Sequence, residues 1–270
     1  MLQRLLIGII GVPLVFAVAL WFPHVVMSVA IMLICAIAAF ELMNAAGLGK
    51  RRLLLVVSVG LACAVPLWAD AEGSFASLLL ILIIALSALF IAGFFDTAIT
   101  FAGICGAFFA GFAPAMALSS LLSISHLPQG RILFLMPFAV SWLCDAFAYF
   151  GGSLLGKHKL APKLSPKKTI EGAISGLAGA FVGMTVFGII LGGVTGQEVD
   201  YLRIFVAALL GGIASQFGDL VFSYIKRQCG IKDFGTVLPG HGGILDRFDS
   251  LIFTAPLILY FLSGASFLVG

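Results

Sequence analysis

The sequence carries very little charge. Only 10% of its 270 residues are Asp, Glu, Lys or Arg, and 61% are hydrophobic. A soluble domain carries about 25% charged residues. A chain with so few charged groups cannot cover a water-facing surface, which excludes an ordinary soluble globular protein. The composition therefore predicts an integral membrane protein.

Paired cysteines and soluble segments are also missing. The five cysteines form no CxxC pair, and four of them lie inside apolar stretches. We interpret them as small apolar residues, so disulfide or zinc roles for the cysteines are not expected. The sequence contains no internal repeat, no low-complexity tract and no stretch polar enough for a separate soluble domain.

Long apolar runs fill most of the chain instead. A bilayer span needs about 20 mostly apolar residues. The runs are continuous rather than alternating, which favours helices over barrel strands. The first is too long for a signal-peptide core and lacks a cleavage site, so we expect it to be a span. We predict an all-α polytopic membrane protein with about nine transmembrane helices, at residues 5–22, 25–46, 53–68, 75–95, 99–124, 132–150, 170–192, 202–225 and 244–267.

Basic residues gather on one side of these predicted spans. With a cytoplasmic N-terminus, thirteen of the fifteen Lys and Arg residues lie inside, and only Arg131 and Arg203 lie outside. This distribution predicts a cytoplasmic N-terminus and a C-terminus on the opposite side. Acidic residues near the inner face concentrate in the later spans. We therefore expect residues 1–130 to be a scaffold of about five helices. Residues 131–270 are expected to be a catalytic region of about four helices with two cytoplasmic polar loops.

One polar stretch, residues 223–249, contrasts with the apolar remainder. Its charged residues surround a glycine-rich turn: Lys226, Arg227, Lys232, Asp233, His241, Asp246, Arg247 and Asp249. Charges between two membrane spans are costly and usually functional. Glycines let the backbone approach a ligand, and the N–H groups of the following helix favour an anion. We therefore expect this stretch to hold the phosphates and the divalent metal of a nucleotide at the cytoplasmic edge.

The acids of this region are spaced to act together. Asp219, Ser223 and Lys226 lie on one helical face, and Asp246 and Asp249 are one turn apart. Magnesium prefers carboxylate oxygens and substrate phosphates. Asp219 and Asp246, from two successive spans, are therefore predicted to hold such ions. A plainer interpretation stays open: a neighbouring helix satisfies Asp219, and the helix dipole favours the other two acids.

Two further polar clusters have alternative interpretations. The SPKKTIEG segment, residues 165–172, places Lys167 and Lys168 before an apolar span. It is either a phosphate grip for the same site or a basic patch that attracts anionic lipid head groups. Asp145, within an apolar span, needs a partner, for which a lysine of the next loop would serve. His241 binds phosphate, acts as an acid or base, or caps the turn.

The polar stretch resembles the signature of the phosphatidate cytidylyltransferase family, also called CDP-diacylglycerol synthases. The matching residues are Ser223-x-Ile225-Lys226-Arg227, then Lys232-Asp233-x-Gly235, then Leu238-Pro239-x-His241-Gly242-Gly243-Ile244-x-Asp246-Arg247-Phe248-Asp249. SPKKTIEG and Asp145-Ala-Phe-Ala-Tyr149 are also similar to that family. The resemblance covers about residues 142–249, whereas residues 1–130 match only as hydrophobic spans.

The resemblance implies a reaction and roles for individual residues. CTP and phosphatidate would give CDP-diacylglycerol and pyrophosphate, with Mg²⁺, in a homodimer of the bacterial plasma (inner) membrane whose site faces the cytoplasm. No nucleic-acid partner is expected. The resemblance implies catalytic roles for Lys226, Asp219 and Asp246, and metal-binding roles for Asp219, Asp246, Asp249 and Asp145. It implies that the substrates are bound by Ser165, Lys167, Lys168, Ser223, Arg227, Lys232, His241 and Arg247.

Other functions are weighed against this one. An ion-coupled transporter would place acids near mid-membrane in both halves, whereas these acids cluster near one face beside lysines. A CTP-using lipid kinase, or a cytidylyltransferase acting on an ether-lipid phosphate, would share much of the polar machinery. A purely structural membrane protein would leave the polar stretch unexplained.

Overall fold

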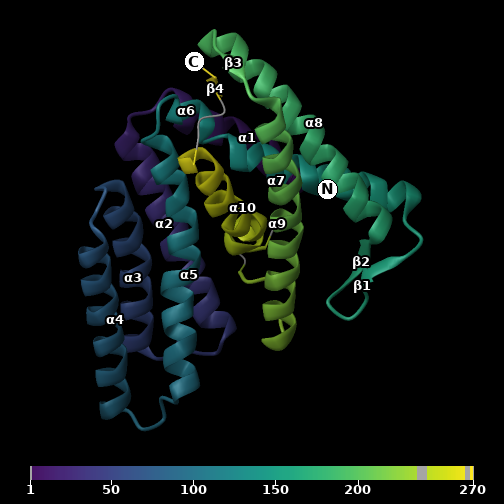
Figure 1. Cartoon of the computed structure of the whole chain (residues 1–270). Coiled ribbons are helices and arrows are strands. Elements are labelled where there is room, and N and C mark those ends of the chain that lie inside the picture. The colour runs from purple at the N-terminus through teal and green to yellow at the C-terminus, as the bar shows by residue number, and fades with distance from the viewer. Residues whose placement is uncertain (1, 236–241, 265–267, 270) are drawn as a thin grey trace. The chain divides into compact units, whose positions relative to one another are not determined.

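The computed structural model describes residues 2–235, 242–264 and 268–269, and most of them are helical (Figure 1). Helices lie at all nine predicted positions. The long helices are α1 (Leu2–Leu20), α2 (His24–Ala45), α3 (Arg52–Asp70), α4 (Phe75–Phe95), α5 (Phe101–Ser125), α7 (Met136–Leu155), α8 (Ile170–Thr195), α9 (Tyr201–Gln228) and α10 (Leu245–Gly264), and the short helix α6 spans Gly130–Leu133.

Within the described chain, seven helical segments are long and apolar enough to cross a membrane. They are α2, α3, α4, α5, the segment Gly130–Leu155, α8 and α9. The other two predicted spans correspond to α1, which has a shorter apolar part at Gly11–Leu20, and to α10, whose first turns carry charged residues. The prediction of an all-α, multi-pass membrane protein is confirmed.

The chain forms two compact units. The first contains Met1–His126 and Gln228–Phe248, and the second contains Leu127–Arg227 and Asp249–Gly270. The polar stretch 223–249 is therefore shared between the units. The predicted scaffold and catalytic regions were separated by expected role, and that functional division stays a prediction.

In the first unit, α2, α3, α4 and α5 pack against one another (Figure 1). Ser74 and Thr100 cap α4 and α5 by accepting the backbone N–H groups of Ser77 and Gly103. Close packing between α3 and α5 depends on Gly111, where an added Cβ would lie 3.0 Å from the Cα of Ser58. Small residues at such contacts are typical of membrane helices. Lipid tails are as apolar as the side chains, so the hydrophobic effect does not drive the helices together and their association relies on close packing.

The second unit uses glycines in the same way. An added Cβ at Gly172 would lie 2.8 Å from the carbonyl oxygen of Ala148, and one at Gly176 would lie 2.9 Å from that of Cys144. These contacts bring α8 against α7. The Gln216 side chain of α9 donates to the carbonyl oxygen of Ala173 on α8, at 2.9 Å. Close backbone approach thus fixes α8 against α7, and a side-chain hydrogen bond links α9 to α8.

Three segments between the predicted spans contain secondary structure that the sequence analysis did not predict. The basic loop before α8 is an antiparallel hairpin of β1 (Lys159–Ala161) and β2 (Ser165–Thr169), because extended residues there pair their backbone groups (Figure 1). The segment after α8 forms β3 (Glu198–Val199), which pairs with β4 (Leu268–Val269). The predicted loop at 126–131 already contains the start of α6.

Candidate functional site

Three acids from three helices come close together in the second unit. Asp145 lies on α7, Asp219 on α9 and Asp249 on α10, and Asp249 interacts electrostatically with the other two. Asp249 is only 8% exposed. The Ser250 hydroxyl donates to Asp145 Oδ2 at 3.4 Å. Gly218 allows this approach of α9 and α10, since an added Cβ there would lie 2.7 Å from the carbonyl oxygen of Asp249. The sequence predicted these acids as one group, and the structure brings them together.

Two lysines join the acids. Lys168 Nζ lies 2.5 Å from Asp219 Oδ2, and the Ser223 hydroxyl donates to Asp219 Oδ1 at 3.3 Å. Lys226 interacts electrostatically with Asp249. Asp219, Ser223 and Lys226 therefore lie on one face of α9, as predicted. Asp219 has a basic partner from a segment about 50 residues earlier in the chain.

The β1–β2 hairpin decides which of the two adjacent lysines reaches the acids. Side chains alternate along a strand, so Lys167 and Lys168 point to opposite faces. Lys168 is partly buried against α9, and Lys167 is exposed. Glu171 fixes the hairpin base by accepting the backbone N–H groups of Lys157 and His158 and by binding the His158 ring at 2.6 Å. The segment that was predicted to bind phosphate is thus a β-hairpin whose two lysines point to opposite faces.

The remaining predicted substrate-binding residues of the second unit lie near this hairpin. Ser165 begins β2, opposite Ala161. Arg227, at the end of α9, donates from Nε to the carbonyl oxygen of Leu164 in the hairpin turn, at 3.4 Å. This contact links the last turn of α9 to the hairpin that carries Lys168.

The donor set suits a hard cation such as Mg²⁺. Asp145, Asp219 and Asp249 bring three carboxylates, whereas Lys168 and Lys226 bring two positive charges. Mg²⁺ is usually held by one or two carboxylates plus substrate phosphates and water. In the described chain, a three-residue group with all ligand atoms within 4.8 Å of one another occurs only at the ends of α2, α3 and α5. The three acids do not form such a group, so a cation held by them would take further ligands from substrate phosphates or water.

In the first unit, Asp246 organises the turn before α10. Its Oδ2 accepts the N–H groups of Phe234 at 2.8 Å and Gly243 at 2.9 Å. Gly242 has φ +80°, a conformation that favours glycine. The side chains of Lys232 and Arg247 are exposed beside this turn. Asp246 thus has a backbone-binding role that its spacing did not reveal.

Two predicted site features stay untested. The shared metal site of Asp219 and Asp246 joins residues of different units and remains a prediction. His241 lies outside the described residues.

Glu41 is a site residue that the sequence analysis missed. It lies on α2, is 2% exposed, and accepts the N–H groups of Ile244 at 3.0 Å and Leu245 at 2.8 Å. Its carboxylate also explains two glycines. An added Cβ would lie 2.6 Å from Glu41 Cδ at Gly243 and 2.9 Å from it at Gly235. A lone acid inside an apolar span was the signal that could have found it.

Glu41 corrects one expectation about the turn. The N–H groups that begin α10 were expected to bind a ligand phosphate. In the structure the Glu41 carboxylate accepts hydrogen bonds from two of them, the N–H groups of Ile244 and Leu245. A negative charge is favourable at that helix end, but it comes from α2 rather than from the nucleotide. Within the first unit, Glu41 of α2 therefore holds the start of α10.

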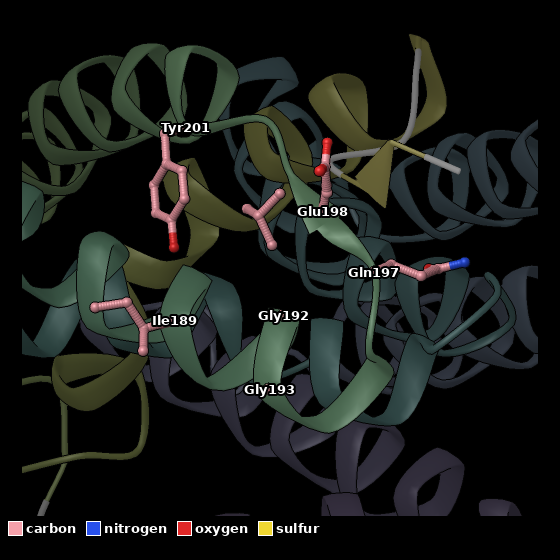
Figure 2. Close-up of a pocket in the computed structure, with 7 residues that line it drawn as sticks. Ile189, Gly192, Gly193, Gln197, Glu198 and Tyr201 are labelled. Atoms are coloured by element: carbon pink, nitrogen blue, oxygen red, sulfur yellow. The ribbon is translucent and has the colours of Figure 1, made fainter.

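A pocket of about 460 Å³ lies elsewhere in the second unit. Ile189, Gly192, Gly193, Gln197, Glu198, Val199 and Tyr201 line it, between the end of α8 and the start of α9 (Figure 2). None of the predicted site residues lines this pocket. We therefore place the candidate site at the acid and lysine cluster, where the charged groups meet.

Comparison with known proteins agrees with these features. The cytidylyltransferase family model matches residues 2–264. A phosphatidate cytidylyltransferase of Brucella abortus biovar 1 (strain 9-941) is 46% identical over 162 residues, which cover 60% of this chain and 56% of that protein. The one of Rickettsia bellii (strain RML369-C) is 42% identical over 149 residues, covering 54% and 64%. The one of Bacillus subtilis (strain 168) is 39% identical over 171 residues, covering 63% and 57%.

The matched part thus spans between half and two thirds of these curated relatives. The family match extends over nearly the whole chain, including the apolar helices that the sequence resemblance did not cover. With its apolar helices, its cluster of acids and lysines, and its glycine-rich turn, the chain belongs to the cytidylyltransferase family.

Proposed function

We propose that the protein transfers CMP from CTP to phosphatidate, giving CDP-diacylglycerol and pyrophosphate. The observation that carries this proposal is the meeting of Asp145, Asp219 and Asp249 with Lys168 and Lys226 in an apolar chain. Lysines attract phosphates, and acids hold the lysines in place and offer oxygens to a cation. Family membership supports CTP as the nucleotide, and the names of the relatives support phosphatidate as the acceptor.

The chemistry needs alignment more than acid–base catalysis. A phosphate oxygen of phosphatidate forms a bond to the α-phosphorus of CTP. The bond from that phosphorus to the oxygen bridging to the β-phosphate breaks, and pyrophosphate leaves with this oxygen. The attacking phosphate is already ionised, so no strong general base is required. The chain must bring two polyanions together and stabilise the leaving group, and Lys168 and Lys226 serve both tasks.

Further basic and hydroxyl groups extend the proposed phosphate site. In the second unit they are Ser165, Lys167, Ser223 and Arg227, and in the first they are Lys232, His241 and Arg247. Lys167 is exposed beside Lys168, so the hairpin offers the phosphates a second cation. Asp246 accepts the backbone N–H groups of Phe234 and Gly243, which are close in sequence to Lys232 and Arg247.

Mg²⁺ belongs to the proposal. Asp145, Asp219 and Asp249 are the residues that would hold it, with Asp246 as the fourth predicted ligand. When bound, it would neutralise charge on the transferring and leaving phosphoryl oxygens.

The setting is a further part of the proposal. The bacterial relatives and the asymmetry of Lys and Arg favour a plasma membrane with the site facing the cytoplasm, where CTP is present. A lipid substrate fits a charged site carried by membrane helices. The family resemblance further implies a homodimer.

The test uses purified full-length protein in detergent with labelled CTP, phosphatidate and Mg²⁺, and it measures labelled CDP-diacylglycerol. We expect product from the wild type and a loss of about 100-fold or more in Asp219→Asn, the size typical for removing one group that organises transition-state charge. The control is Glu198→Gln, an exposed acid in the same unit. Because α8 is 26 residues long, Glu198 is separated from the hairpin by about 39 Å of helix.

The outcomes separate the reaction from the site. Absence of CDP-diacylglycerol from folded wild-type protein would refute the proposed reaction, and a phosphorylated lipid in its place would indicate a CTP-using lipid kinase. Full activity in Asp219→Asn would keep the reaction and refute the role of the acid cluster. If Glu198→Gln also lost activity, the loss in both variants would reflect general destabilisation of the protein rather than a change at the site.

A further inference from the structure

Three side chains with metal-ligand atoms meet at one end of the first unit. His24 begins α2, Asp70 ends α3, and His126 follows α5. Asp70 Oδ1 lies 3.3 Å from His24 Nδ1 and 3.3 Å from His126 Nε2. The two imidazole rings are 4.6 Å apart between centroids. All ligand atoms of the group lie within 4.8 Å of one another.

These distances match the geometry of a small coordination sphere. In a tetrahedral zinc site with bonds of about 2.0–2.1 Å, two ligand atoms are about 3.3 Å apart. Both Asp70-to-imidazole distances have this value. The ligand atoms of the two imidazoles lie within 4.8 Å of each other, so a cation placed between the three residues would be within reach of all of them after side-chain adjustment.

His24 has hydroxyl neighbours at both ring nitrogens. Ser125 Oγ lies 2.8 Å from His24 Nε2, and its hydroxyl donates to the carbonyl oxygen of Leu122 at 2.6 Å. Ser28 Oγ lies 3.4 Å from His24 Nδ1, and its hydroxyl donates to the carbonyl oxygen of His24 at 3.1 Å. In the tautomer with its proton on Nε2, His24 turns the lone pair of Nδ1 toward the Asp70 carboxylate at 3.3 Å, where a cation would bind both groups.

The second ring nitrogen of each histidine has a polar neighbour. Histidines that bind metals usually donate their other ring N–H to a hydroxyl, carbonyl or carboxylate, which fixes the ring orientation. Ser125 Oγ, 2.8 Å from His24 Nε2, is within hydrogen-bond distance. His126 Nε2 faces Asp70, and its Nδ1 lies 3.8 Å from Glu72 Oε1, which is an ion-pair distance rather than a hydrogen bond.

The ligand types select the kind of cation. Two imidazoles and one carboxylate favour borderline transition metals such as Zn²⁺ over Mg²⁺, which prefers oxygen ligands. The side chains are 35%, 25% and 30% exposed for His24, Asp70 and His126, so an ion from water can reach them. We propose that His24, Asp70 and His126 bind one transition-metal dication, with Zn²⁺ as the test ion. The bound ion would link the ends of α2, α3 and α5, and this site is independent of the proposed transferase reaction.

The test measures zinc binding to the purified full-length protein in detergent. Chelator-treated protein is titrated with Zn²⁺ by calorimetry in excess Mg²⁺, which occupies oxygen-only sites. We expect one Zn²⁺ per chain attributable to this group in the wild type, and its loss in Asp70→Asn and in His126→Ala. His158→Ala is the control, because His158 also pairs with an acid but lies in the second unit, and it should keep the zinc.

Two further readouts separate a metal site from a structural ion pair. Co²⁺ should give the visible absorption bands of a tetrahedral nitrogen and oxygen site in the wild type, but not in Asp70→Asn. Zn²⁺ should raise the unfolding temperature of the wild type and leave that of Asp70→Asn unchanged. Equal zinc binding in Asp70→Asn and wild type would overturn the proposal. No zinc binding by the wild type would overturn it too, and would leave an Asp70 ion pair with protonated histidines.

Discussion

Replacing Glu41 with glutamine should loosen the start of α10, although the side chain keeps its size. The carboxylate accepts two backbone N–H groups, those of Ile244 and Leu245, with one oxygen each. A glutamine amide has one acceptor oxygen, so one N–H loses its partner and faces another donor. The change also removes a negative charge from a helix N-terminus, where it is favourable.

The magnitude follows from the burial of this contact. Glu41 is 2% exposed, so water cannot easily replace its oxygens. A hydrogen bond to a charged group contributes about 1.5–3 kcal/mol. We expect Glu41→Gln to cost about 1.5–3 kcal/mol and Glu41→Ala, which removes both acceptors, about 3–6 kcal/mol. These values correspond to an opening equilibrium, and so an amide exchange rate, that is roughly 10-fold to 150-fold higher for glutamine, since each 1.4 kcal/mol is a factor of ten.

The assay is amide hydrogen exchange of the peptide that contains residues 242–249, measured on full-length protein in detergent. Exchange at Ile244 and Leu245 should rise in the order wild type, Glu41→Gln, Glu41→Ala. Ser58→Ala is the matched control. Ser58 is fully buried in the same unit, and its hydroxyl has no hydrogen-bond partner in the described part of the chain, so its removal should cost little.

The reasoning would be refuted by wild-type exchange rates in Glu41→Gln. It would also fail if Ser58→Ala accelerated exchange at the start of α10 as much as Glu41→Ala does, because the effect would then be general loosening of the unit. If the proposed transferase activity is established, Glu41→Gln should lower kcat more than stability alone predicts. The turn that carries Asp246 would then be held less firmly.

Three further outcomes are expected. Gly111→Ala should destabilise the first unit by about 1–3 kcal/mol, because the new methyl meets the backbone of α3, whereas Gly60→Ala, which meets nothing within 4 Å, should be neutral or stabilising in thermal unfolding. Lys168→Met should reduce CDP-diacylglycerol formation by about 100-fold, because it removes the ion pair with Asp219. Lys163→Met, in the exposed hairpin turn, is the control and should retain activity. Equal activity of the two variants would contradict a role for the Lys168–Asp219 ion pair. Glu171→Ala should free the hairpin base and speed limited proteolysis there, and unchanged cleavage would show that strand pairing suffices.

From the sequence alone follow the membrane class, the positions of the helices and several of the acids and lysines of the candidate site. Length and continuous apolarity identify a spanning helix without knowledge of its neighbours, because the bilayer imposes the same constraint on each span. For the same reason Asp145 and Asp219 stood out, since an acid among apolar residues needs a partner wherever the helix packs. Periodicity also placed Ser223 on the Asp219 face, which the hydrogen bond between them confirms.

The tertiary structure decided which groups become partners. Strand alternation in the hairpin selects Lys168 for Asp219, although the composition of SPKKTIEG gives both lysines equal standing. Glu41 reaches the start of α10 across about 200 residues of chain, a contact that no local pattern encodes. His24, Asp70 and His126 come from three separate segments, so no local pattern groups them. Partner choice depends on which helix ends and faces meet, and that is set by small-residue packing between whole helices rather than by spacing along one of them.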